Sequence, residues 1–91
     1  MVSAKIKFTV FGLVQGVGFR YFVARNAMAM GLRGYVRNEY DGTVSGVAIG
    51  DPTSIERLKS LLRTGHSRSR VDNVIFEEFA GEDNFVTFEI R

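Results

Sequence analysis

The sequence predicts an α+β fold, in which one antiparallel sheet carries two helices on the same face. Three observations support this class. Residues 5–10 alternate apolar and polar side chains, residues 19–30 repeat apolar side chains at steps of three and four, and Asp41-Gly42 separates two short strand-like runs. A chain of 91 residues is long enough for one hydrophobic core, so a single domain over 1–91 is expected.

The first strand is expected over Lys5–Val10, with Ile6, Phe8 and Val10 facing inward. The first helix is expected from Phe19 or Arg20 to Met30. Its apolar positions have the helical spacing, and a glycine suited to the C-terminal cap follows at once. These positions are Phe22, Val23, Ala27 and Met30, followed by Gly31.

Two further strands are expected over Arg33–Glu39 and Thr43–Ile49. The turn Tyr40-Asp41-Gly42 joins them, and Asp-Gly is a strong hairpin signal because both residues tolerate positive φ. A second helix then follows and ends at Gly65. It begins either with a capping box from Thr53 to Glu56 or with Asp51 as the cap before Pro52. Its apolar face is formed by Ile55, Leu58, Leu61 and Leu62.

The polar segment 66–70 is expected to be a solvated loop, including its histidine and two arginines. A strand over Val71–Phe79 comes next, with Val74 and Phe76 inward. After a turn at 81–84, a last strand places Val86, Phe88 and Ile90 inward. The order strand, helix, strand, strand, helix, strand, plus one added strand, is the split βαβ, ferredoxin-like pattern.

Composition excludes several classes of function. The chain has no cysteine, so disulfides, thiolate metal sites and a cysteine nucleophile are excluded. His66 has no acidic or cysteine cluster beside it at ligand spacing, so no metal site is expected there. No apolar run is long enough for a membrane span and no signal-peptide pattern appears, which predicts a cytoplasmic protein. A net charge of +2 suits an anionic substrate but does not by itself indicate nucleic acid.

The segment Gly12–Arg20 links the first strand to the first helix and is predicted to bind a phosphate. Gly16 and Gly18 allow main-chain N–H groups to turn inward at a helix start, where an anion is favoured. Arg20 adds a planar charged fork that can bind two phosphate oxygens. A dinucleotide fingerprint is excluded because Tyr21 replaces its third glycine, and a P-loop is excluded because Phe19-Arg20 replaces Lys-Ser/Thr.

Asn38 is predicted to lie near this loop. In the ferredoxin-like topology the first two strands run in the same direction, with the third strand between them, so their C-terminal ends share one edge. The loop leaves the first strand there, and Asn38 stands near the end of the second. A neutral amide beside an anion can hold a water molecule because it both donates and accepts. The alternative role is that Asn38 only prepares the hairpin turn.

Three blocks of the sequence closely resemble the acylphosphatases: Val14-Gln15-Gly16-Val17-Gly18-Phe19-Arg20, Gly34-Tyr35-Val36-Arg37-Asn38 and Asp41-Gly42-Thr43-Val44. The resemblance covers nearly the whole chain. It implies hydrolysis of acyl phosphates to a carboxylate and inorganic phosphate, without metal, cofactor or covalent intermediate. The catalytic arginine and asparagine of the family fall on Arg20 and Asn38. The resemblance also implies that Arg20 binds the phosphate together with the main-chain amides of Gln15, Gly16, Val17, Gly18 and Phe19. One departure is Gly65-His66, where the family often has Gly-Pro.

Two rival functions share this fold. RNA-recognition modules have the same element order, but the Arg33-Gly34-Tyr35 start of their aromatic signature is broken by Val36 and Arg37. The second rival is a regulatory phosphate-binding domain without activity, because fold does not dictate function. The favoured expectation is a monomeric enzyme whose partner is a small acyl phosphate, and not a nucleic acid or a membrane.

Overall fold

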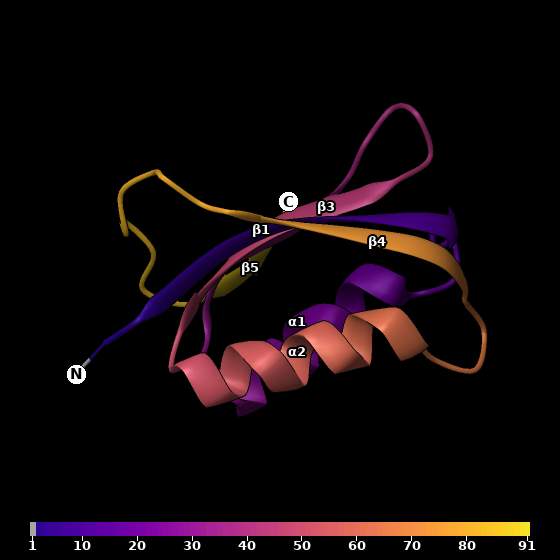
Figure 1. Cartoon of the computed structure of the whole chain (residues 1–91). Coiled ribbons are helices and arrows are strands. Elements are labelled where there is room, and N and C mark those ends of the chain that lie inside the picture. Colours follow the sequence, from indigo (N-terminus) through magenta and orange to yellow (C-terminus); the bar gives the residue numbers. More distant parts are fainter. Residues whose placement is uncertain (1) are drawn as a thin grey trace.

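The computed structural model describes residues 2–91, and its elements follow the predicted order (Figure 1). Strands and helices are β1 (Ala4–Leu13), α1 (Phe19–Ala29), β2 (Arg33–Asn38), β3 (Val44–Gly50), α2 (Pro52–Thr64), β4 (Arg70–Glu78) and β5 (Phe88–Ile90). Figure 1 shows both helices beneath the same face of the sheet, as expected.

The strands lie side by side in the order β4-β1-β3-β2-β5. β3 pairs antiparallel with both β1 and β2, so β1 and β2 run in the same direction, as the topology predicts. β1 and β4 are also antiparallel. β5 pairs in parallel with β2, so the expected antiparallel arrangement holds for four strands and the added strand makes the sheet mixed.

The core lies between the sheet and the helices. The alternation of β1 places Ile6, Phe8 and Val10 there, and none of them is more than 7% exposed. Phe8 pairs with Gly46 of β3, and a Cβ on that glycine would lie 2.5 Å from the Phe8 ring. The glycine therefore makes room for the aromatic ring. The helices contribute Phe19, Val23, Ala24, Ala27, Ile55, Leu58 and Leu62.

The start of α2 corrects the capping-box interpretation. The carboxylate of Asp51 accepts hydrogen bonds from the N–H groups of Thr53 (3.1 Å) and Ser54 (3.3 Å), and Pro52 is the first helical residue. Asp51 is therefore the cap, and Thr53 already lies inside the helix. Proline decides between the two patterns, since its fixed φ and missing N–H suit the first helical position.

The β2–β3 turn is a hairpin, as predicted, but its backbone differs from the expectation. Gly42 has φ +92°, whereas no non-glycine residue among those described, Asp41 included, has positive φ. The Asp41 carboxylate instead accepts hydrogen bonds from the N–H (3.0 Å) and hydroxyl (2.6 Å) of Thr43. A side-chain turn of this kind replaces the second positive φ.

The last strand is shorter than predicted. β5 includes only Phe88–Ile90, and Val86 is 94% exposed rather than inward-facing. The segment between β4 and β5 crosses the sheet on the face opposite the helices, which we call the open face. Its Phe85 ring lies 5.8 Å from the Tyr35 ring, and Asp83 forms an ion pair with Arg33.

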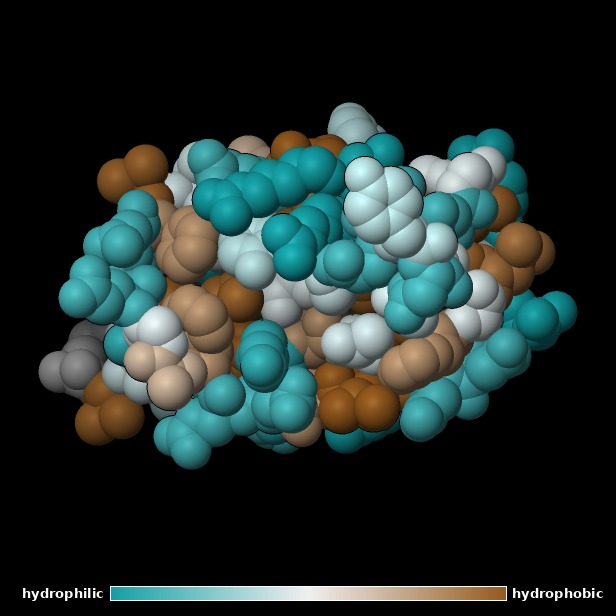
Figure 2. Space-filling model, turned by 90° about the horizontal axis from the view of Figure 1, so that it is seen from above, coloured by the Kyte–Doolittle hydropathy of each residue, from teal (hydrophilic) through white to brown (hydrophobic). Residues whose placement is uncertain are grey.

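Hydrophilic side chains spread over the open face, with apolar ones scattered among them (Figure 2). This face is the solvated side that an antiparallel sheet usually presents. Within residues 2–91, neither helix combines the length and the apolar character that crossing a bilayer requires.

Candidate active site

The loop between β1 and α1 has the backbone that its glycines predict. Gly16 and Gly18 have φ of +74° and +77°, in the left-handed region that other residues rarely adopt. Gly18 is the N-cap of α1, where no side chain caps the free N–H groups and no acidic residue stands in the first turn. A helix start of this kind favours an anion.

Arg20 and Asn38 line the same hollow, of about 180 Å³. Arg20 comes from the first turn of α1, and Asn38 is the last residue of β2. The full lining is Val14, Gly16, Gly18, Phe19, Arg20, Tyr21, Asn38 and Ile90. We call this hollow the phosphate pocket, after the anion that the sequence predicts here. It brings together most of the residues singled out from the sequence, although 18 positions separate the arginine from the asparagine along the chain.

The guanidinium of Arg20 is oriented by the residue that follows β5. Its Nη1 donates a hydrogen bond to the main-chain oxygen of Arg91 at 2.9 Å. The N–H of Arg91 donates in turn to the oxygen of Val36 in β2, at 2.8 Å. Arg91 therefore links the arginine to the same strand that carries Asn38.

Gln15 and Val17, two of the expected phosphate-binding residues, do not line the phosphate pocket. Val17 packs against the core instead. The Nε2 of Gln15 donates to two main-chain oxygens of the β2–β3 hairpin, Glu39 at 2.7 Å and Thr43 at 2.9 Å. The side chain of Gln15 therefore ties the loop to the hairpin.

Two residues in or near the pocket, Ile90 and Arg68, were not singled out from the sequence. Ile90 joins the lining because β5 lies beside β2, and a parallel pairing at the far edge leaves no local sequence signal. Arg68 borders the loop from the other side, where a Cβ placed on Gly18 would lie 4.0 Å from its Nη2. A second positive charge thus stands close to the helix start.

His66 differs from the solvated side chain expected for it. The residue is half-buried, its ring lies 5.0 Å from the Phe22 ring, and its Nδ1 accepts a hydrogen bond from the Arg68 N–H at 3.0 Å. It packs the 66–70 loop against α1. Among residues 2–91, no three His, Cys, Asp or Glu side chains are grouped so that they could hold a metal ion.

Two carboxylates of the β2–β3 hairpin have lowered pKa values. The pKa of Glu39 is lowered chiefly by the hydrogen bond from the Ser45 hydroxyl, with the Arg37 guanidinium as second cause. The pKa of Asp41 is lowered by its hydrogen bonds from Thr43. Both groups therefore stay ionised near neutral pH, and their partners hold the hairpin in place.

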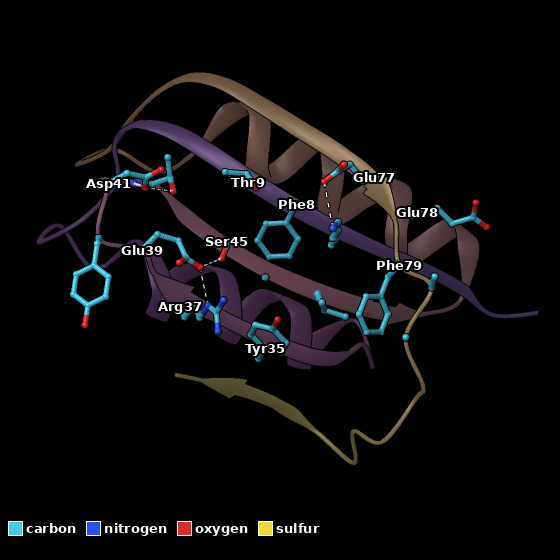
Figure 3. Close-up of a pocket in the computed structure, with 17 residues that line it drawn as sticks. Phe8, Thr9, Tyr35, Arg37, Glu39, Asp41, Ser45, Glu77, Glu78 and Phe79 are labelled. Carbon is cyan, nitrogen blue, oxygen red and sulfur yellow. Dashed lines mark hydrogen bonds and ion pairs between the residues drawn. The ribbon is translucent and has the colours of Figure 1, made fainter.

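A larger hollow, of about 880 Å³, lies on the open face (Figure 3). Both basic residues in its lining form ion pairs: Arg37 with Glu39 at 2.7 Å, and Lys7 with Glu77 at 3.7 Å. Tyr35 is covered by the guanidinium of Arg91, 4.2 Å from its ring centroid. The basic groups of this hollow are therefore paired with carboxylates, and an arginine lies over its tyrosine ring.

Known proteins resemble this chain both in sequence and in fold. A family model described as acylphosphatase matches residues 6–90. An acylphosphatase of Pasteurella multocida (strain Pm70) is 46% identical over 87 residues, which are 96% of this chain and 97% of that protein. The solved acylphosphatase of Coxiella burnetii superposes with a TM-score of 0.92 at 39% identity, covering 98% of this chain and 93% of that one. For the acylphosphatase of Bacillus subtilis the TM-score is 0.91 at 31% identity, with 99% of each chain covered. The family model, the relatives and the fold show that this chain belongs to the acylphosphatase family.

Proposed function

We propose that this chain hydrolyses the carboxyl–phosphate bond of acyl phosphates, with Arg20 and Asn38 as its catalytic residues. Support comes above all from the phosphate pocket, which is lined by a guanidinium, a neutral amide and an uncapped helix start. Together they offer positive charge to a phosphoryl group and a hydrogen-bonding partner to a water molecule.

In this proposal Arg20 and the main-chain N–H groups of the loop hold the phosphoryl oxygens. The side-chain amide of Asn38 holds a water molecule on the far side of phosphorus from the carboxylate. The water oxygen forms a bond to phosphorus while the bond between phosphorus and the acyl oxygen breaks. The carboxylate leaves with the bonding electron pair, and the protons of the water remain on phosphate oxygens.

No general acid is needed for the leaving group, because a carboxylic acid has a pKa of about 4 and its anion leaves unprotonated. The protein therefore contributes position and charge stabilisation, which dominate phosphoryl transfer in general. Arg20 is suited to both tasks, since its fork binds two oxygens and its charge is permanent.

Hydrolysis of benzoyl phosphate in ¹⁸O-labelled water tests this function. We expect turnover that resists a chelator, with one labelled oxygen in inorganic phosphate and none in benzoate. Label in benzoate would mean attack at the carbonyl carbon and would contradict the mechanism. Tight binding of inorganic phosphate without turnover would favour a regulatory domain, the second candidate for this fold.

A further inference from the structure

A second hollow meets the phosphate pocket between α1 and β5. It has a volume of about 470 Å³ and is lined by Tyr21, Ala24, Arg25, Met28, Phe88 and Ile90. Tyr21 and Ile90 also line the phosphate pocket, so the two hollows adjoin at these two residues. We call the second one the α1–β5 groove.

The groove follows from the helical repeat of α1. The helix contributes Tyr21, Ala24, Arg25 and Met28 to the groove. Each lies three or four positions from another member of the set, so together they form one stripe along the helix. Among the six described residues that line the groove, Arg25 alone carries a charge, and its guanidinium lies 5.9 Å from the Tyr21 ring centroid.

Large apolar side chains remain exposed here. Tyr21 is 64% exposed, Met28 55% and Ile90 47%, while Phe88, at 4%, forms a buried floor. Exposed apolar side chains gathered beside a polar site are typical of a ligand groove. Methionine suits such a place because its unbranched chain adapts to differently shaped ligands.

We propose that the α1–β5 groove binds the acyl group of the substrate and gives the enzyme a preference for acyl phosphates with apolar acyl groups, either straight-chain or aromatic. The proposal rests on the proposed function, since it places the phosphoryl group in the phosphate pocket. From there the acyl chain passes between Tyr21 and Ile90 and extends toward Met28. A small polar acyl group would leave the groove empty and gain nothing from it.

A series of straight-chain acyl phosphates from acetyl to hexanoyl tests the groove. For the unchanged protein we expect kcat/KM to rise roughly two- to fourfold for each added methylene, the effect of partly to fully burying one such group. Benzoyl phosphate should react better than acetyl phosphate for the same reason.

Met28→Gln is the decisive variant, because glutamine has similar length and helix propensity but is polar. We expect it to flatten the dependence on chain length, while kcat/KM for acetyl phosphate and inhibition by inorganic phosphate change less than twofold. Ile75→Thr is the matched control: Ile75 is 45% exposed on β4, outside both hollows, and threonine keeps its β-branch. This control should retain the full dependence on chain length.

Two results would overturn the proposal: no dependence on acyl length in the unchanged protein, or the same dependence in the Met28→Gln variant. Either would be seen while acetyl phosphate is still hydrolysed. Failure of the proposed function would look different, since no acyl phosphate, acetyl phosphate included, would then be turned over.

Discussion

The Nε2 of Gln15 lies 2.7 Å from the main-chain oxygen of Glu39, the residue that directly follows Asn38. This hydrogen bond joins the loop beside the phosphate pocket to the strand end that carries Asn38, the proposed catalytic amide. We therefore predict that Gln15 is a positioning residue, whose side chain fixes where Asn38 stands relative to Arg20.

If this is its role, Gln15→Ala should lower kcat by roughly tenfold, because small displacements of a positioned group have large effects on rate. Inhibition by inorganic phosphate should stay within twofold. In an Asn38→Ala background the same change should have no further effect on kcat, since residues that act as a unit are non-additive. Equal losses in both backgrounds would show that Gln15 acts independently of Asn38.

Gln15→Glu is the length-matched variant and should also lose activity at neutral pH, because a carboxylate cannot donate to the two carbonyls.

Asn38→Ala itself should lower kcat by roughly a hundred- to a thousandfold, the usual effect of removing one positioned hydrogen-bonding group. Inorganic phosphate should still inhibit, because the charges that hold it are unchanged. Steady-state kinetics with phosphate as inhibitor measures both quantities. If phosphate no longer inhibited this variant, Asn38 would be a binding residue.

For Arg20, two substitutions separate charge from shape. Arg20→Ala should lower the rate by roughly a thousandfold and remove most of the inhibition by inorganic phosphate. Arg20→Lys keeps the charge without the planar fork, so weak phosphate inhibition should return with little recovery of rate. Arg57→Ala, an exposed arginine on α2, serves as control for a change of one charge. A rate for Arg20→Ala within tenfold of the unchanged protein would exclude the proposed role.

A glycine is needed at position 16 because of its backbone conformation, and not because a side chain would find no room there. No atom would lie within 4 Å of a Cβ placed on it, yet its φ is +74°. Gly16→Ala should fold with a loss of about 1 kcal/mol in the free energy of unfolding, and phosphate should bind more weakly because the loop N–H groups shift. Gly31→Ala is the matched control, with φ +73° and equally open surroundings outside the pocket. Urea unfolding should show similar losses for both variants, with phosphate inhibition altered only by the change at Gly16.

The hairpin carboxylates predict a loss of stability in acid. Because the pKa values of Glu39 and Asp41 are lower in the folded protein than in the unfolded chain, folding is favoured most when both are ionised. This stabilisation is complete above their ordinary pKa values of about 4 and disappears as the pH falls through the lowered values. The Glu39→Gln, Asp41→Asn double variant should therefore be less stable at pH 7 and lose less between pH 5 and pH 2. Urea unfolding midpoints across that range give the slope of stability against pH. The Glu82→Gln variant, which changes an exposed carboxylate, serves as the control. A slope equal to that of the unchanged protein would refute the assignment.

Much of the site could be predicted because it depends on local chemistry and on a simple topology. The glycines of the loop need positive φ, and the parallel direction of β1 and β2 brings Arg20 and Asn38 to one edge. The cap of α2 was ambiguous because two patterns overlapped, and the N-terminal preference of Pro52 decided between them.

What could not be predicted depends on partners distant in the sequence. Gln15 stands in a glycine-rich turn, and nothing in its neighbours indicates that its side chain reaches carbonyls 24 and 28 residues away. The wall formed by Ile90 depends on the pairing of β5 with β2, which a run of three strand residues does not specify. Alternation placed Val86 in this strand as well, but its side chain is left in solvent.

The side of the site that β5 builds is less stable than the rest of the protein. This strand has only three residues, two of them exposed, yet it supplies Ile90 to the pocket wall and leads directly to the acceptor for Arg20 on Arg91. Short elements with few buried groups detach at free energies below that of global unfolding. Mild denaturant would then inactivate the enzyme while the other four strands and both helices remain intact, so loss of turnover would precede loss of the circular dichroism signal.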